Sequence, residues 1–284
     1  YFKTLQGTAS QVIKTNTEGK MERTMYDTSE MPVPAFQQLI PMEGITSGTG
    51  AGFGTANQDG SILVLVGNAT NELFRFARDT NTGLYVMTHN VSATPGGGAT
   101  SAIQIMGNYV YLFQDGGNFE TCYRYDLADL TNETLMTMPS IDTAGSNYGS
   151  VAWTDGTYMY LKTSKVNTTA YKMSVSGTTF TTVTTSATFN TVSGGVGACT
   201  MFDGTNNYVF IFGSGSAPTI YKGADVFISS ATSTAKNMSS WTDNADGAIM
   251  INIDANRCYI GRLETNYDET TTVKAFLMLY PVTK

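Results

Sequence analysis

Gly107-Asn-Tyr-Val-Tyr-Leu-Phe113 joins a tight-turn dipeptide to a short run of aromatic and β-branched residues. Glycine beside Asn or Asp supplies the positive φ angles that a two-residue hairpin needs. A run of this length and type is typical of a nearly buried β-strand. The combination recurs about every 48 residues along the chain. The other turns are Asp59-Gly60, Asp155-Gly156, Asp203-Gly204 and, in the fifth place, Asp254-Ala255-Asn256.

Each turn is the centre of a larger repeat. A second β-forming run, with one cation in it, lies about 16 to 20 residues beyond the turn. The cations are Arg75, Arg124, Lys172, Lys222 and Lys274. A third run follows, such as Leu84-Tyr-Val-Met87, and a strand such as Ala102-Ile-Gln-Ile-Met106 enters the turn. Four short strands in a unit of this length are the sequence signature of a β-propeller.

The N-terminal part resembles a degenerate copy of the same repeat unit. Gln6-Gly7 stands at the turn, Gln11-Val-Ile-Lys14 at the following strand and Arg23 at the cation, while Leu39-Ile-Pro-Met42 resembles the third run Leu135-Met-Thr-Met-Pro139. We therefore predict an all-β fold, a six-bladed β-propeller. The alternative is five blades plus an N-terminal arm.

A propeller must close into a ring, so its first and last units should touch. We predict a single propeller domain over residues 1–284, with residues 1–45 as a degenerate first blade or arm. The last unit ends after its third strand. An N-terminal strand, either Tyr1-Phe-Lys-Thr-Leu5 or Phe36-Gln-Gln-Leu-Ile40, is therefore expected to complete the last sheet.

The composition limits the possible partners. The 284 residues are 41% hydrophobic and 14% charged, with a net charge of −7. Scattered basic residues and a negative charge argue against binding to nucleic acid or to anionic membranes. No apolar stretch is long enough to span a membrane, and no signal-peptide pattern is visible. The three cysteines, Cys122, Cys199 and Cys258, are predicted to be small buried packing residues rather than redox groups.

One unit resembles a kelch repeat. Tyr109-Val-Tyr-Leu-Phe113 followed by Gly116-Gly117 is similar to the kelch strand and its double glycine, and Cys122-Tyr-Arg-Tyr-Asp126 is similar to the strand that carries the family's Tyr. Asn207 to Gly215 repeats the first half of the motif. The Trp expected after the Tyr is absent, because Leu130-Thr131-Asn132 stands there. The resemblance implies a propeller and no particular function.

The amino-acid composition of the chain is similar to that of bacteriophage tail-fibre and other virion proteins. It is rich in Thr, Ser, Asn and Gly, as in Ser176-Gly-Thr-Thr-Phe-Thr-Thr-Val-Thr-Thr-Ser186. This resemblance is one of composition rather than of motif, and it implies a structural or host-binding role.

Catalytic signals are weak. His89, the only histidine, is interpreted as a surface residue at the end of an outer strand. The glycines of Gly48-Thr-Gly-Ala-Gly-Phe-Gly54 precede no helix that would hold a phosphate. The recurring acids lie in turns, where Asp usually bonds to the backbone, and none recurs on an innermost strand. We therefore predict no catalytic residues and no enzyme activity.

No cofactor or metal is predicted either. Asp115-Gly-Gly-Asn118 and Asp126-Leu-Ala-Asp129 offer oxygen ligands for calcium, but neither matches a full calcium loop. The repeated cations are interpreted as pairing on exposed blade strands, away from the axis, rather than as an anion-binding ring.

The favoured function is a non-enzymatic virion structural or binding module, a phage tail or fibre component that contacts another virion protein or a host-surface glycan. Tyr148, Trp153 and Trp241 are the candidate residues for stacking on sugars, with blade packing as the alternative, above all for Trp153. The expected location is the virion or, alternatively, the extracellular space, and a symmetric assembly fits a virion part. Three alternatives remain: a secreted or cell-surface bacterial propeller that binds carbohydrate or protein, an intracellular kelch-like adaptor, and a glycan-cleaving enzyme.

Overall fold

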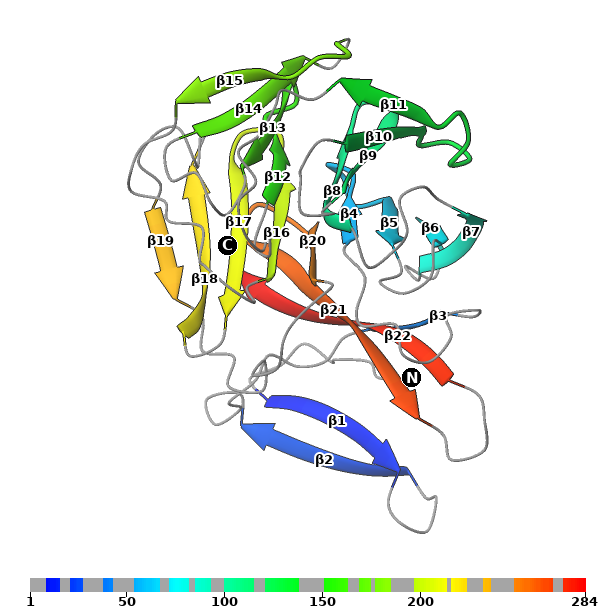
Figure 1. Ribbon diagram of the computed structural model, residues 1–284. Helices are drawn as coiled ribbons and strands as arrows, with labels where there is room; N and C mark the ends of the chain where they lie inside the picture. Colours follow the sequence, from blue (N-terminus) through cyan, green and yellow to red (C-terminus); the bar gives the residue numbers. More distant parts are fainter. Residues whose placement is uncertain are drawn as a thin grey trace.

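The chain forms antiparallel β-sheets arranged around an axis (Figure 1). The structure is a computed structural model and describes residues 9–15, 21–27, 38–42, 54–66, 72–81, 85–92, 100–114, 121–137, 151–162, 169–174, 177–184, 197–213, 216–223, 232–235, 248–267 and 273–284. These residues form strands and turns and contain no helix. Within them, no helical segment has the length and hydropathy to cross a membrane. The all-β propeller prediction is confirmed.

Five sheets have four strands each, in chain order from the first strand of the unit. The first two sheets consist of β4 (Gly54–Ala56), β5 (Ile62–Val66), β6 (Glu72–Arg78) and β7 (Tyr85–Ser92), and of β8 (Thr100–Met106), β9 (Tyr109–Gln114), β10 (Thr121–Asp126) and β11 (Thr134–Thr137). The next two consist of β12 (Val151–Thr154), β13 (Tyr158–Lys162), β14 (Thr169–Ser174) and β15 (Thr181–Thr184), and of β16 (Gly197–Phe202), β17 (Asn207–Gly213), β18 (Ser216–Gly223) and β19 (Thr232–Ala235). The last consists of β20 (Ala248–Asn252), β21 (Arg257–Tyr267), β22 (Val273–Thr283) and β3 (Gln38–Met42).

The first strands of these sheets surround the axis. Each of β4, β8, β12, β16 and β20 contacts the first strands of the two neighbouring sheets, and β20 returns to β4. The described part of residues 1–37 forms only a two-stranded sheet of β1 (Ala9–Thr15) and β2 (Met21–Asp27). The count of six blades is therefore not confirmed, and the five-membered ring matches the alternative arrangement. The predicted turn at Gln6-Gly7 lies outside the described residues.

An N-terminal strand completes the last sheet, as predicted. β3 pairs antiparallel with β22, with Met42 opposite Ala275 and Gln38 opposite Leu279. The closing strand Gln38–Met42 thus overlaps the candidate Phe36–Ile40, whose first two residues lie outside the described residues, as does the candidate Tyr1–Leu5. Leu39–Met42 does occupy an outermost position, like the third runs of other units. This segment belongs to the last sheet, however, and not to a degenerate N-terminal unit.

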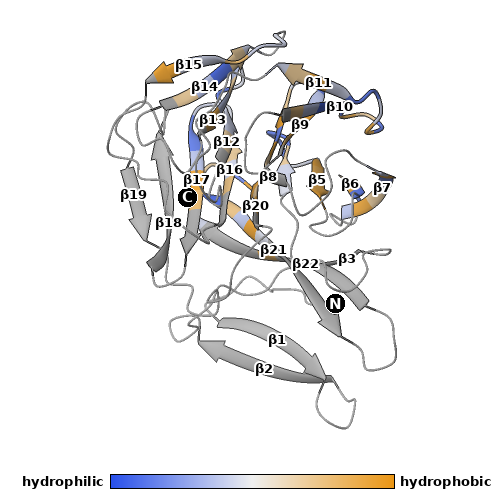
Figure 2. Cartoon of the chain, in the orientation of Figure 1, coloured by the Kyte–Doolittle hydropathy of each residue, from blue (hydrophilic) through white to orange (hydrophobic). Residues whose placement is uncertain are grey.

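Alternate side chains of each inner strand pack against different neighbours. In β5, Leu63 and Leu65 face the last sheet, where they join Ile249 and Ile251. Val64 and Val66 face the second sheet instead. Because both faces of the strand are covered, the sequence is apolar at every position, and Figure 2 shows this for β5.

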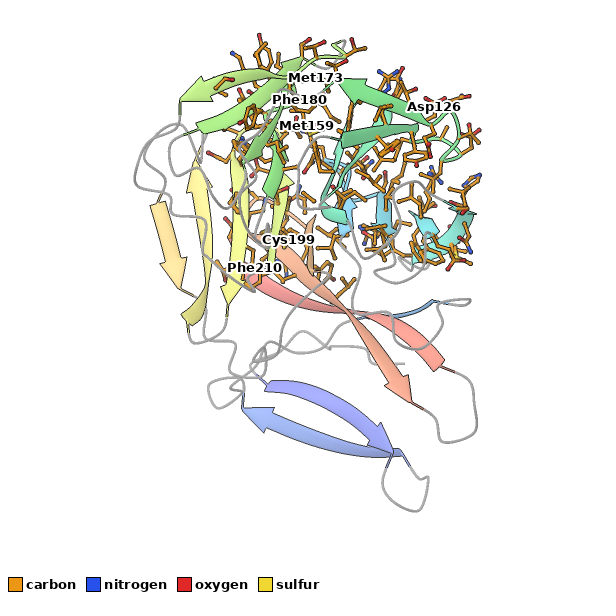
Figure 3. All side chains as sticks on the ribbon, viewed as in Figure 1. Asp126, Met159, Met173, Phe180, Cys199 and Phe210 are labelled. Carbon is orange, nitrogen blue, oxygen red and sulfur yellow. The ribbon has the colours of Figure 1, made fainter. Side chains whose placement is uncertain are left out.

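A third cluster fills the space between the second and third sheets, with Met159, Met173 and Phe180 among its members (Figure 3). Cys122 is part of the same cluster. All three cysteines are free and buried, as the sequence predicted. Burial raises the pKa of the Cys122 and Cys199 thiols, so both stay protonated at neutral pH.

Candidate functional site

The turns between the first and second strands meet at one end of the axis. Four glycines in them have positive φ, as the hairpin pattern predicted: Gly60 (66°), Gly107 (59°), Gly156 (84°) and Gly204 (95°). The Asp of each Asp-containing turn accepts backbone N–H groups through its Oδ1. These bonds join Asp59 to Ser61, Asp155 to Thr157 and Tyr158, Asp203 to Thr205 and Asn206, and Asp254 to Asn256 and Arg257.

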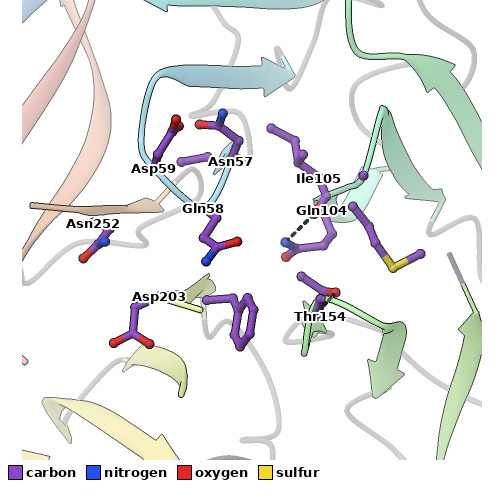
Figure 4. A pocket seen from close by; sticks show the side chains of 13 residues that line it. Asn57, Gln58, Asp59, Gln104, Ile105, Thr154, Asp203 and Asn252 are labelled. Carbon is purple, nitrogen blue, oxygen red and sulfur yellow. Dashed lines mark hydrogen bonds between the residues drawn. The ribbon is translucent and has the colours of Figure 1, made fainter. Parts of the chain in front are cut away.

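These turns and the strand ends before them enclose a funnel of about 540 Å³ on the axis (Figure 4). Every four-stranded sheet contributes to its wall. The wall residues with polar side chains are Asn57, Gln58, Asp59, Gln104, Thr154, Asp203 and Asn252. A funnel of this volume is within the usual range for small-ligand sites.

Buried hydrogen bonds join the inner strands of different sheets beside the funnel. The hydroxyl of Thr200 on β16 lies 2.8 Å from Gln104 Oε1 on β8 and 2.8 Å from the carbonyl oxygen of Ala152 on β12. The amide Nε2 of Gln104 donates to the carbonyl oxygen of Ile105, and the backbone N–H of Ile105 donates to Thr55 Oγ1 on β4. Four of the five inner strands are therefore joined by polar contacts.

Two carboxylates stand in the funnel wall. Hydrogen bonds from the side chain and backbone of Ser61 lower the pKa of Asp59. Burial raises the pKa of Asp203, but the backbone N–H groups of Asn206 and Thr205 and the side chains of Tyr208 and Lys284 outweigh it, so the net shift is downward. Both groups are therefore ionised at neutral pH.

Asp203 also belongs to a buried ion pair. Lys284 Nζ lies 3.3 Å from Asp203 Oδ2, and only 2% of the Lys284 side chain and 14% of the Asp203 side chain are exposed. The same ammonium lies over the ring of Tyr208, 5.1 Å from its centroid. Lys284 follows β22, so this pair joins the last sheet to the turn of the fourth.

Two features of the wall suit a polar organic ligand. The Oδ1 atom of Asn252 is buried and has no hydrogen-bond donor among the described residues. Phe202, at the end of β16, places a half-buried aromatic ring in the same wall, and a Cβ on Gly156 would lie 3.1 Å from that ring. Ligand sites typically combine such an apolar surface with a few placed polar groups.

The sugar-stacking residues predicted from the sequence lie elsewhere or outside the described residues. Trp153 on β12 is 1% exposed, and its ring stacks on Tyr160 with centroids 5.1 Å apart. This position fits the packing alternative, because the protein covers the indole, and it does not support sugar binding. Tyr148 and Trp241 lie outside the described residues, so their role stays a prediction.

The other candidate residues have structural surroundings. His89 lies on the outermost strand β7, half exposed, as predicted. Arg75 donates to the carbonyl oxygen of Leu127 in the next sheet, while Arg124 and Lys172 lie over the rings of Tyr109 and Tyr158, their strand neighbours. The interpretation of these three cations as pairing residues away from the axis is confirmed. Lys222 and Lys274 lie on β18 and β22, but the structure does not describe their side chains.

The two calcium candidates gain no support. Asp126 Oδ2 accepts from Asn132 Nδ2, and Asp129 Oδ1 accepts from the hydroxyl and backbone N–H of Thr131, so the carboxylates brace their own loop. The described part of the chain has no group of three or more His, Cys, Asp or Glu side chains placed to hold a metal ion. Asp115–Asn118 lies outside the described residues.

Sequence reasoning missed the residues that line the funnel. Gln104 is the informative case, because it is the one polar side chain in Ala102-Ile-Gln-Ile-Met106, a strand that is otherwise apolar. Asn252 and Phe202 each end an entering strand. Their positions could have identified them, because the last residues before each turn lie at the axis.

No protein-family model matches the chain, and no curated protein matches it in sequence. Among solved structures, it is similar to a GH43 glycoside hydrolase engineered to display both endo-xylanase and exo-arabinofuranosidase activity, with 10% identity, a TM-score of 0.53, and coverage of 87% of this chain and 54% of that chain. GH43B of a Bacteroides ovatus xyloglucan PUL follows with 11% identity, a TM-score of 0.49 and coverage of 84% and 54%. Kuenenia stuttgartiensis hydrazine synthase has 12% identity, a TM-score of 0.41 and coverage of 84% and 65%. The chain spans less than two thirds of the length of these three proteins.

The likeness to the engineered GH43 protein shows the propeller fold. It also corrects the prediction that the chain is not an enzyme, since a glycoside hydrolase has the same fold. That prediction failed because acids located in turns do not exclude catalysis when the turns themselves surround the axial funnel. The comparisons give no support to the kelch or virion resemblance.

Proposed function

We propose that the axial funnel binds a neutral carbohydrate. The observation that carries the proposal is the funnel wall, which combines the amide side chains of Gln104 and Asn252 with the half-buried ring of Phe202. Amide groups both donate and accept hydrogen bonds, as sugar hydroxyls do. The ring of Phe202 would pack against the apolar face of the sugar. Carbohydrate binding corresponds to the secreted or cell-surface alternative, and the fold shared with a GH43 glycoside hydrolase favours it over the virion interpretation.

The charge of the funnel selects among glycans. Asp59 and Asp203 are both ionised at neutral pH, and Lys284 neutralises only Asp203. The chain as a whole carries a net charge of −7. Anionic sugars would meet repulsion on entering the funnel, whereas neutral sugars would not.

A glycan array followed by titration calorimetry tests the proposal. We expect neutral glycans to bind, and we expect Phe202→Ala and Asn252→Ala each to weaken binding about tenfold, corresponding to about 1.4 kcal/mol. Tyr123→Ala, a half-buried aromatic on β10, and Asn90→Ala, an exposed amide on β7, are the matched controls and should leave the affinity unchanged. The proposal would be refuted if no neutral glycan binds, or if the Phe202 and Asn252 variants bind as tightly as the unchanged protein.

Hydrolysis of the bound glycan is the second candidate function. The funnel wall holds two carboxylates, and most glycosidases use such a pair. The lowered pKa of Asp59 and of Asp203 suits a base or a nucleophile, and neither group is protonated as a general acid would be. Release of reducing ends from a bound glycan, abolished by Asp59→Asn, would establish hydrolysis; stable binding without release would leave binding as the function.

A further inference from the structure

A groove lies between the first and second sheets, which are neighbours in the ring (Figure 1). Its volume is about 550 Å³, close to that of the funnel. Ile62 of β5 and Arg75 of β6 form one side of the groove. The other side consists of residues 108–109 at the start of β9 and residues 126–129 at the end of β10. The groove is thus a second space that the proposed function does not yet involve.

Hydrogen bonds hold the two sides of the groove in place. Arg75 Nε donates across the groove to the carbonyl oxygen of Leu127 over 2.8 Å, and Arg75 Nη1 lies 2.7 Å from Thr88 Oγ1 on its own sheet. On the other side, the backbone N–H of Leu127 donates to the carbonyl oxygen of Asn108. The folded ring therefore forms the groove before any ligand arrives, and a pre-formed site loses less free energy to ordering when it binds.

A single turn separates the groove from the funnel. Gly107 lines the funnel, and the next residue, Asn108, lines the groove. In the first sheet, Asp59 lines the funnel and Ile62 lines the groove. Gly107 has no side chain, and both Gly107 and Asn108 are exposed, so the ridge between the two spaces is open to solvent. Consecutive Cα atoms are about 3.8 Å apart, so a chain of linked sugars can reach both spaces.

The side chains of the groove suit a neutral sugar. Ile62 is half-buried and supplies an apolar surface, while Asn108 and Asp129 are exposed and supply an amide and a carboxylate. Hydrogen bonds from the side chain and backbone of Thr131 lower the pKa of Asp129, so its carboxylate is ionised at neutral pH and accepts hydrogen bonds from hydroxyl groups. The groove thus combines an apolar surface with a few polar groups, as ligand sites typically do.

We propose that this groove is a second sugar-binding subsite, so that the protein takes an oligosaccharide with one unit in the funnel and a later unit in the groove. This inference rests on the proposed carbohydrate-binding function. The sugar chain crosses the turn at Gly107-Asn108, and Asn108 and Asp129 bond to hydroxyl groups of the unit in the groove. Affinity increases with the number of linked units, because a unit tethered in the funnel raises the effective concentration of the next unit at the groove.

Titration calorimetry with linear oligosaccharides of increasing length, built from the neutral sugar that the glycan array identifies, tests the inference. For the unchanged protein, we expect the longest oligosaccharide to bind about tenfold more tightly than the monosaccharide. Ala128→Tyr, at an exposed position of the groove, should fill the groove and reduce this ratio to about one. Asn108→Ala should weaken binding of the longest oligosaccharide about fivefold and leave the monosaccharide unaffected.

The matched control is Asn256→Ala. Asn256 is also an exposed turn residue, and its carbonyl oxygen accepts the backbone N–H of Lys284 as that of Asn108 accepts the N–H of Leu127. It lines neither the funnel nor the groove, so its substitution should leave every affinity unchanged. Phe202→Ala, in the funnel, should weaken the monosaccharide and the oligosaccharides alike.

The outcomes separate the inference from the function on which it rests. Equal affinity for all lengths in the unchanged protein, or a preference for long ligands that survives Ala128→Tyr, overturns the groove subsite and leaves carbohydrate binding in the funnel intact. If no neutral glycan of any length binds to the unchanged protein, the inference and the proposed function fail together.

Discussion

Removal of residues 1–44 is expected to lower the free energy of unfolding by about 3–5 kcal/mol, because it deletes β3 from the last sheet. Five residue pairs join β3 to β22, from Gln38–Leu279 to Met42–Ala275, and each backbone hydrogen bond is worth about 1 kcal/mol. The contacts of β4 and β5 with β20 would remain, so the ring itself should stay closed. Urea denaturation followed by circular dichroism measures the change.

The control for this deletion keeps β3. Removal of residues 1–30 takes away β1 and β2, which in the described structure pair only with each other. We expect the free energy of unfolding to change by less than about 1 kcal/mol, since truncation is tolerated where the lost backbone bonds little to the rest. Equal effects of the two deletions would show that β3 does not stabilise the last sheet.

Asp203→Asn is expected to cost about 3 kcal/mol of stability. The substituted amide can still accept the N–H groups of Thr205 and Asn206, so the turn is preserved. The ammonium of Lys284, only 2% exposed, would lose its counter-ion, and an unpaired buried charge is strongly destabilising. Adding Lys284→Met should recover part of the loss, because the stranded charge is then removed.

The matched control for Asp203→Asn is the exposed pair in the next turn. Arg257 and Asp254 also form an ion pair, but their side chains are 59% and 40% exposed. Water screens such pairs, so Asp254→Asn should destabilise the protein less than Asp203→Asn does. A larger effect at Asp254 would contradict the role assigned to burial.

Asp203→Asn should also change how the stability of the protein depends on acid pH. The pKa of Asp203 is lowered below its ordinary value of 3.8 in the folded chain, so the ionised group stabilises the fold above that pH. The contribution is lost as the pH falls through the lowered folded-state pKa. Between pH 5 and 2, Asp203→Asn should therefore lose stability less steeply than the unchanged protein; parallel curves would show that Asp203 does not contribute.

Local chemistry made much of the fold predictable. Turn glycines need positive φ, and two-sided burial requires apolar residues at successive positions of an inner strand, so both leave short-range patterns in the sequence. For this reason the sequence predicted three features: the turns at Gly60 and Gly156, the inner strand Ile62–Val66 and the outer strand that carries Arg75. Even the closing strand at Gln38–Met42 followed from the missing fourth strand of the last unit.

The candidate site was not predictable in the same way, because its residues meet only after the ring closes. Thr200 and Gln104 are 96 residues apart, and Lys284 and Asp203 are 81 residues apart. The repeat determined by itself that the chain builds antiparallel sheets with tight Asp and Gly turns. Only the tertiary structure decided how many sheets surround the axis and which side chains line the funnel, because inter-sheet packing and closure depend on contacts between residues far apart in the chain.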